Sequence, residues 1–507
     1  MSIVSDVLGR RVSSRKVTAR ILLAGTFAWG AAASVSAQPV GIPTMGATSN
    51  SDLSPMLERR LGDAIMVQGR RDPTYIDDVE LAQYLTTMGR KLAAFAPGGA
   101  PEIQVFGVRD PSINAFALPG GYIGINSGLV VSSDSESELA GVLAHEIGHV
   151  SQRHIARGFT QQSRTGTMMM ATVAASLLAA LAGGSADLAT GVAAFGQAAA
   201  INQQLGFSRD AEREADRAGL EMLNKGGYDP AGMARMFGRL MNVSRLNEGV
   251  GGGSYASTHP LSIERMSDVQ NRVRMSAPSY YEDSEDFWLM RAKLRLMQAN
   301  DTQGQRVVVQ QFSNEAQSLT GLRQGAARYG LALAALRRGN LDEADAWLAQ
   351  IRAGGMDNPQ LARLDVELSW ARKDGARALQ QSEQAYERWP QRRSLGYAYV
   401  QSLQQAGRHE DAVDFLRARE AEWARDDPRV YQLIAQSTEK LDQPVAARRD
   451  MARYYIATGA LPAAVAQLTQ ARSMSTDFYE QSQIDVEIRQ AKEQLEEERE
   501  LLERFKS

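Results

Sequence analysis

Residues 135–158 read SESELAGVLAHEIGHVSQRHIARG, and this stretch decides how the N-terminal half of the chain folds. Ser135 followed by Glu138 is a capping-box pattern that begins a helix, and we expect one helix to the end of the stretch. His145 and His149 are four residues apart, which puts both imidazoles on one helix face, about 6 Å apart at Cβ. Two imidazoles so placed can bind one tetrahedral metal ion.

Glu146 directly follows the first of these histidines. Its carboxylate can reach a water on the metal without being a ligand. Zinc lowers the pKa of bound water to about 7, and a carboxylate then takes the proton as the water attacks a carbonyl. The pattern predicts a metallopeptidase site with one Zn²⁺ per chain. The chain has no cysteine and only five histidines, so its ligands must be His, Asp or Glu.

A third protein ligand is expected, and His154 is the nearest candidate in sequence. It lies five residues after His149, whereas the metzincin pattern places its third histidine six residues after the second, with a glycine between. Here the sixth residue is Ile155 and the glycine position is Gln152. We therefore expect His154 to lie on the surface or to support a ligand from behind.

A carboxylate on a second helix is the other known arrangement. Residues 208–217 read SRDAEREADR, and Glu212 and Asp216 share one face of the helix that we expect over 209–225. Glu212 would bind zinc, and Asp216 would accept a hydrogen bond from a ligating imidazole and orient it. Glu214 falls on a different face and is expected to form a structural ion pair. Without the histidine motif, this acidic cluster would read as a solvated helix face.

The rest of the N-terminal half mixes helices with short strands. Helical patterns cover 53–68 and 77–95, and the segments 103–108, 114–120 and 122–130 read as strands joined by Gly and Pro turns. We expect residues 53–278 to form an α+β zinc metalloprotease domain of the gluzincin type, within a mainly α chain.

Residues 159–206 are rich in Met, Ala and Gly, with MMMATVAASLLAALA at 168–182. Fifteen apolar residues are fewer than the roughly 20 that a membrane-spanning helix needs. The segment is expected to be an apolar hairpin or lid beside the active site. It is also a candidate for peripheral contact with a membrane or with an unfolded client.

Internal repetition marks residues 285–482. The turn at 339–344 (GNLDEA) matches the turn at 407–412 (GRHEDA), an offset of 68 residues, or twice 34. Ala378 lies midway between Ala344 and Ala412, the alanines of these two turns, and Ala446 lies 34 residues beyond Ala412. A 34-residue period with a small residue at the helix contact is typical of tetratricopeptide repeats. We expect these repeats to form an α-solenoid on which the metalloprotease domain packs.

The two ends of the chain and its charge suggest where it works. Residues 1–37 have the layout of a secretory signal peptide, with a basic stretch, a short apolar run and small residues before a cleavage site. Residues 38–52 follow as a flexible lead-in, and 483–507 read as a charged C-terminal helix. The N-terminal layout predicts export from the cytoplasm. The net charge of −3 gives no electrostatic case for nucleic acid.

Three motifs together carry a family resemblance: HEIGH at 145–149, EREAD at 212–216 and SYASTHPLSIERM at 254–266. The chain resembles the peptidase family of CAAX prenyl proteases and HtpX-type membrane proteases. Its signal and repeats are similar to those of the periplasmic subfamily that enhances β-barrel assembly. The membrane members have several spanning helices and this chain has none that qualifies, which favours soluble protein clients.

The resemblance implies roles for further residues. Glu212 matches the glutamate zinc ligand of the family. His259 matches a histidine near the metal, which either stabilises the tetrahedral intermediate or binds zinc as a fourth ligand and displaces the water. Arg265 matches an arginine that positions this histidine or the substrate. Asn114 and Ala115 match the edge strand along which a substrate peptide would lie, an arrangement that tolerates many sequences.

Together these features predict a periplasmic zinc endopeptidase that degrades misfolded or stalled outer-membrane β-barrel proteins. Its expected partners are unfolded or misassembled envelope proteins and, through the repeats, the β-barrel assembly machinery. The alternative is a chaperone or assembly adaptor that acts through the repeats while the protease is latched.

Overall fold

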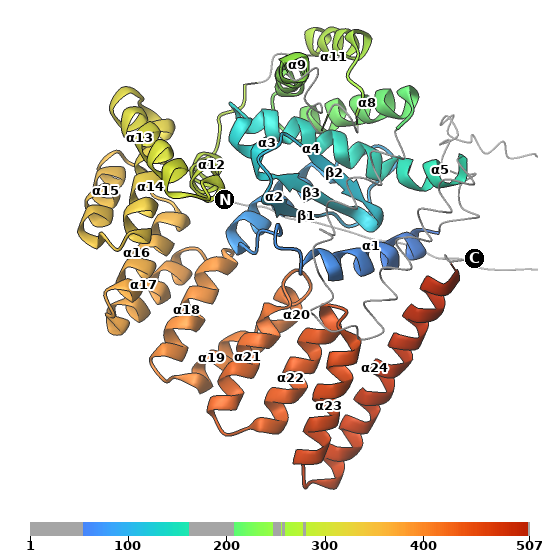
Figure 1. Ribbon diagram of the computed structural model, residues 1–507, viewed down its shortest axis with the longest axis vertical. Coiled ribbons are helices and arrows are strands. Elements are labelled where there is room, and N and C mark those ends of the chain that lie inside the picture. The colour runs from blue at the N-terminus through green and yellow to red at the C-terminus, as the bar shows by residue number, and fades with distance from the viewer. Residues whose placement is uncertain (1–53, 162–206, 247–254, 256–258, 277–279, 505–507) are drawn as a thin grey trace, which may run out of the picture. The chain divides into compact units, whose positions relative to one another are not determined.

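The computed structural model describes residues 54–161, 207–246, 255, 259–276 and 280–504 (Figure 1). The expected signal peptide, the lead-in and residues 162–206 of the apolar hairpin lie outside these residues. Across the described helices, none has the length and apolar character needed to span a bilayer. All described residues belong to one compact unit.

The N-terminal half combines helices with a small sheet. Its elements are α1 (Pro55–Gly69), α2 (Val79–Ala93), β1 (Gln104–Val108), β2 (Ala115–Leu118), η2 (Pro119–Gly121), β3 (Tyr122–Asn126), α3 (Ser127–Ser132), α4 (Glu136–Ser151), α5 (His154–Gln161), α8 (Arg209–Lys225), α9 (Ala231–Leu246) and α11 (Ile263–Met275).

The described C-terminal half is entirely helical between its turns. Its elements are α12 (Glu285–Gln298), α13 (Thr302–Ser318), α14 (Gly321–Arg337), α15 (Leu341–Ala353), α16 (Pro359–Ala371), α17 (Gly375–Arg388), α18 (Arg393–Gln405), α19 (His409–Arg417), α20 (Glu420–Trp423), α21 (Arg429–Lys440), α22 (Pro444–Ala457), α23 (Leu461–Met474) and α24 (Phe478–Arg504). The chain is therefore mainly α, with an α+β metalloprotease half and a helical-repeat half.

The three strands form one sheet in the order β1-β3-β2, with β1 parallel and β2 antiparallel to β3. The predicted strand over 122–130 is wrong in its second half, because β3 ends at Asn126 and α3 begins at Ser127. The run that follows Ser127 is apolar and short, and such a run cannot be assigned to strand or helix by periodicity alone. In α3 it buries Leu129 and Val130 in the core.

The predicted single helix over 135–158 is also wrong at its end. Ser135 caps the start of α4 as expected, but α4 stops at Ser151 and α5 begins at His154. Between them Arg153 adopts a left-handed conformation with φ of 53°, while its side chain lies 3.4 Å from Glu58 in α1. The break turns the chain so that His154 faces back towards α4.

The repeat half is a series of antiparallel helix pairs, in which each helix packs on its sequence neighbours (Figure 1). Left-handed residues recur in its turns at Gly339, Lys373, Gly407 and Asp442, which are 34, 34 and 35 residues apart. The alanine that follows five residues later is buried each time, at 344, 378, 412 and 447. The expectation for Ala446 is therefore off by one residue, because the last turn contains one extra position.

Candidate metalloprotease active site

Two glycines allow α4 and α8 to cross closely. A Cβ at Gly148 of α4 would lie 2.9 Å from both Cα and the carbonyl oxygen of Ala215 in α8. A Cβ at Gly219 of α8 would lie 3.2 Å from the backbone nitrogen of His145. Because no side chain separates the helices here, histidines on α4 come within reach of carboxylates on α8.

Four side chains converge at this crossing. Nε2 of His145 lies 3.0 Å from Nε2 of His149 and 3.5 Å from the Glu212 carboxylate. Nε2 of His149 lies 3.6 Å from the same carboxylate. His259, which comes just before α11, places its Nδ1 3.0 Å from Glu212 and 3.4 Å from Nε2 of His145.

The donor set fits a metal ion. One ligand atom from each of His145, His149, Glu212 and His259 lies within 4.8 Å of all the others. None of the four residues is more than 1% exposed, so their donor atoms face one another in the interior. Two histidines and a glutamate are the protein ligands of a known class of catalytic zinc site.

The pKa shifts of His149 and Glu212 suit metal binding, whereas His145 would have to lose a proton before it could bind a metal. Burial and the neighbouring His145 hold the pKa of His149 well below its usual range, which keeps the ring neutral. Burial raises the pKa of Glu212, but the nearby histidines outweigh it and lower the pKa well below its usual range. Burial lowers the pKa of His145, whereas Asp216 and Glu212 raise it to about 9.

Asp216 stands behind one of these histidines. Its Oδ1 lies 2.9 Å from Nδ1 of His145, which leaves Nε2 directed at the cluster. Arg265 of α11 donates two hydrogen bonds to Asp216, at 2.8 and 2.7 Å, and its Nη1 lies 2.5 Å from Glu212. The same Nη1 donates to the carbonyl of Pro260 at 2.9 Å. Arg265 thus ties both carboxylates of α8 to the segment that carries His259.

His154 supports the other histidine. Its Nδ1 lies 2.9 Å from Nδ1 of His149, and its Nε2 lies 3.0 Å from Glu214, which also accepts from Arg157 at 2.8 Å. Burial and Arg157 lower the pKa of His154 to about 4 against the effect of Glu214. A neutral His154 that donates from Nε2 to Glu214 must accept at Nδ1. His149 then carries its proton on Nδ1 and offers Nε2 to a metal.

Glu146 sits beside this cluster without joining it. It is fully buried, and its Oε1 lies 3.4 Å from Nε2 of His259. Neither carboxylate oxygen makes a hydrogen bond among the described residues, which leaves both available to a water or a proton. The arrangement brings a buried carboxylate next to a candidate metal centre.

The expected substrate strand lies close to the active-site helix. Ala115 begins β2, which lies at one edge of the described sheet and packs against α4. Asn114 comes just before the strand, and its backbone oxygen accepts a hydrogen bond from Asn126 at 3.0 Å. Both residues are buried, at 3% exposure for Asn114 and 0% for Ala115.

Two aromatic residues at the site were not among the residues expected there. The ring of Tyr255 lies 4.6 Å from that of His259, and the ring of Phe207 lies 3.9 Å from that of His149. Tyr255 lies within the motif at 254–266 and Phe207 precedes the motif at 212–216, but nothing in their spacing indicates that they contact the histidines. The link from His154 to His149 could have been inferred only in general terms, from the proximity of the two residues in sequence.

The chain is similar in sequence to a peptidase family and to several known proteins. Residues 80–273 match the model described as Peptidase family M48. The Beta-barrel assembly-enhancing protease of Escherichia coli (strain K12) is 31% identical over 473 residues, which cover 92% of this chain and 92% of that protein. The Putative beta-barrel assembly-enhancing protease of Vibrio cholerae is 34% identical over 327 residues, covering 63% of this chain and 65% of that protein.

One further relative and one solved structure are also similar to parts of the chain. The Metalloprotease LoiP of Escherichia coli (strain K12) is 30% identical over 197 residues, covering 38% of this chain and 71% of that protein. The solved TPR domain of P58(IPK) is 12% identical and covers 70% of this chain and 98% of that chain, with a TM-score of 0.16, which is too low to support a conclusion.

Proposed function

Because the chain belongs to Peptidase family M48, as a relative of the beta-barrel assembly-enhancing proteases, we propose that it is a periplasmic zinc endopeptidase that degrades misfolded or stalled outer-membrane β-barrel proteins. The convergence of His145, His149, Glu212 and His259 beside Glu146 is the observation on which the zinc site and its chemistry rest. The β-barrel clients are suggested by the names of the relatives. The secretory layout of residues 1–37 supports the periplasm.

In this proposal His145, His149 and Glu212 hold the zinc ion. When bound, zinc would polarise the scissile carbonyl and lower the pKa of the attacking water. Glu146 would take the proton from that water on its carboxylate and later give it to the leaving amine. Asp216 would hold His145 in the tautomer that offers Nε2.

His259 is proposed to latch the resting enzyme. A catalytic zinc site keeps one position open for water, whereas a site with four protein ligands is closed. Nδ1 of His259 is 3.0 Å from Glu212 and 3.4 Å from Nε2 of His145, which suits a fourth ligand. A latch suits a protease that meets unfolded proteins in transit.

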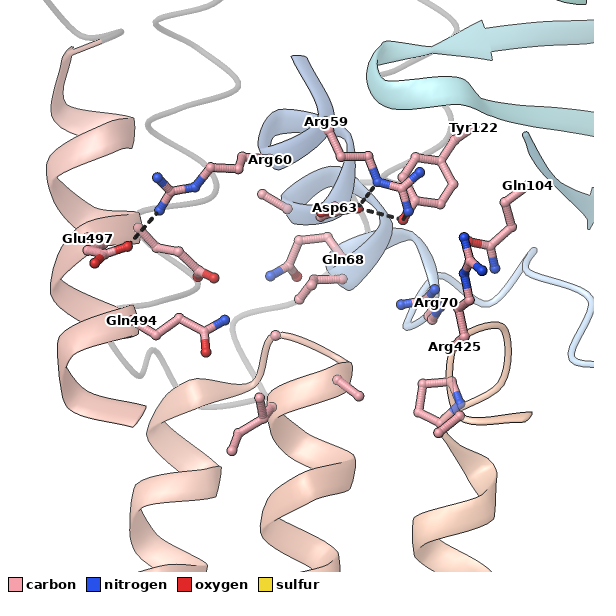
Figure 2. A pocket seen from close by; sticks show the side chains of 18 residues that line it. Arg59, Arg60, Asp63, Gln68, Arg70, Gln104, Tyr122, Arg425, Gln494 and Glu497 are labelled. Carbon is pink, nitrogen blue, oxygen red and sulfur yellow. Dashed lines mark hydrogen bonds and ion pairs between the residues drawn. The ribbon is translucent and has the colours of Figure 1, made fainter. Parts of the chain in front are cut away.

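An adaptor role through the repeats is the second candidate. Cavities between the two halves favour this adaptor role, because their polar surfaces could bind a segment of a partner protein. One cavity of about 580 Å³ lies between α1 and the C-terminal helices, where Arg60 faces Glu497 across 3.4 Å (Figure 2). Another of about 460 Å³ includes Gln401, Gln404 and Gln436. Such surfaces are proposed to contact envelope clients and the β-barrel assembly machinery.

Zinc content and proteolysis of an unfolded protein test these roles. The purified chain should hold about one zinc, and Glu146→Gln should keep the zinc but lose proteolysis. Under the latch, His259→Ala raises basal proteolysis. If His259 instead stabilises the oxyanion, the same change lowers it by about a hundredfold or more. If the purified chain holds no zinc, the proposed zinc site is wrong. If His259→Ala lowers basal proteolysis, the proposed latch is wrong.

The adaptor role separates from proteolysis in cells. Glu146→Gln should still restore β-barrel assembly in cells that lack the protein, if the repeats do the work. If Glu146→Gln does not restore assembly, and outer-membrane proteins accumulate bound to this variant, then proteolysis rather than the adaptor role is the function of the protein.

A further inference from the structure

Two aromatic rings stack on the imidazole of His259. Tyr255 lies 4.6 Å away between ring centroids, with an interplanar angle of 25°. Phe207 lies 5.5 Å away, also at 25°. The imidazole and Tyr255 are each 1% exposed. The rings come from separate parts of the chain, since Phe207 precedes α8 whereas Tyr255 lies four residues before the histidine.

We propose that Tyr255 and Phe207, here called the aromatic clasp, are positioning residues that hold His259 in the fourth ligand position of the metal site. The clasp rests on the proposed latch and deepens it. Its function is to set how readily the latch opens, and therefore how low the basal activity of the protease is.

The orientation of the imidazole explains why a clasp is needed. His259 directs Nδ1 at Glu212 and His145, whereas its Nε2 lies 3.4 Å from Glu146. A rotation of the imidazole about its Cβ–Cγ bond would take Nδ1 away from the ligand position. Flat rings packed parallel to the imidazole resist that rotation because they would lose their stacking.

The clasp also connects the latch to the zinc ligands. Phe207 packs on His149 as well, with ring centroids 3.9 Å apart and an angle of 33°. On the other side, the backbone nitrogen of His259 donates to the carbonyl of Tyr255 at 2.8 Å. Tyr255 therefore moves with the histidine, whereas Phe207 stays with the fixed part of the site. Opening the latch separates the two.

Substitutions that remove a flat ring but keep apolar bulk test the clasp. Tyr255→Leu and Phe207→Leu should each raise basal proteolysis of an unfolded protein by about two- to tenfold, the fold-change that corresponds to the loss of one stacked pair. His259→Ala sets the upper limit. Tyr255→Phe keeps the ring and should rescue the low basal activity, whereas a catalytic hydroxyl would make this variant slower. Phe312→Leu in α13 controls for the loss of a buried aromatic elsewhere.

A second readout does not depend on activity. In the full chain loaded with Co²⁺ in place of zinc, the visible absorption reports whether a fourth protein ligand is bound. Tyr255→Leu and Phe207→Leu should shift the spectrum towards that of His259→Ala and speed the transfer of zinc to a chelator by a similar factor, while Tyr255→Phe keeps the wild-type spectrum. Circular dichroism checks that each variant is folded.

The outcomes separate the clasp from the latch. If His259→Ala opens the enzyme but Tyr255→Leu and Phe207→Leu match the wild type in spectrum and proteolysis, the clasp is wrong and the latch stands. If His259→Ala loses activity and leaves the Co²⁺ spectrum unchanged, the latch itself fails. A rise in Phe312→Leu equal to that in the clasp variants would mean that general loosening, rather than stacking, controls basal activity.

Discussion

The contact of His154 with His149 favours the tautomer of His149 that directs Nε2 at the proposed metal site. The hydrogen bonds run from His149 through His154 to Glu214 and Arg157. Most zinc-ligating histidines donate directly to a carboxylate or a carbonyl, whereas here a second imidazole stands between the ligand and its carboxylate. The longer chain is possible because the left-handed turn at Arg153 brings His154 back over the ligand.

We therefore expect His154→Ala to weaken zinc binding by about 10- to 100-fold, the usual effect of removing a partner that orients a ligand. Competition with a chelator measures the affinity. His409→Ala removes a histidine from α19 of the repeats and should leave zinc affinity unchanged. Equal affinities in the two variants would mean that His154 does not orient His149.

At the scale of the helices, a small residue at the crossing of α4 and α8 sets the distance between them and therefore the geometry of the site. A methyl group at Gly148 would meet the backbone of Ala215 at 2.9 Å, so the two helices would have to separate. Separation moves His145 and His149 away from Glu212, and overpacking of this kind costs about 1–3 kcal/mol.

Gly148→Ala should therefore lower both the thermal stability and the zinc affinity. The matched control is Gly158→Ala in α5, where an added Cβ meets no atom within 4 Å and where alanine favours the helix by up to about 1 kcal/mol. Calorimetry and zinc competition on both variants decide the point. If Gly148→Ala keeps wild-type zinc affinity, the spacing of these helices does not control the site.

The sequence predicted elements where local pattern and tertiary structure agree. His145 and His149 at helical spacing, the cap at Ser135 and the recurring repeat turns all belong to this class. It did not predict the break at Arg153, because no glycine or proline marks it and its ion pair with Glu58 comes from a helix nearly a hundred residues away. Phe207 could not be predicted as part of the site, since stacking has no fixed spacing.

At the scale of the whole molecule, the metalloprotease half and the first repeat helices share one core and one buried anchor. The main apolar cluster includes Leu143 of α4 together with Phe287 of α12. At the start of α4, the carboxylate of Glu136 accepts hydrogen bonds from Tyr281 at 2.9 Å and from the backbone and side chain of Ser284 at 2.8 and 2.9 Å. The first repeat helix is thereby fastened to the active-site helix.

The described unit should therefore unfold in one cooperative transition. Loss of bound zinc and loss of repeat helicity should follow the same temperature curve, because neither half retains a complete core without the other. Circular dichroism and a zinc-sensitive dye, recorded on the same sample, make the comparison. Two well-separated transitions would show that the halves are independent.

Ion pairs add to this contact between the halves without replacing the core. Asp426 accepts from Arg90 of α2 at 2.7 Å and from Arg393 of α18 at 3.1 Å. Burial raises the pKa of Asp426, but Arg90 and Arg393 outweigh it and hold the pKa below its usual range. The carboxylate is charged at neutral pH, and this contribution to stability is lost only as the pH falls through that lowered pKa.

The proposed metal ligands are buried, with His145 and His149 at 0% exposure and Glu212 and His259 at 1%. A chain that loses its ion is left with these polar groups buried and facing one another, and binding energy that stabilised the fold is gone. Such a chain unfolds more often and is then degraded by other proteases. When zinc is scarce, no stable pool of metal-free enzyme would then remain to be reloaded with zinc. Scarcity would shorten the lifetime of each molecule, and cellular abundance would follow the metal supply.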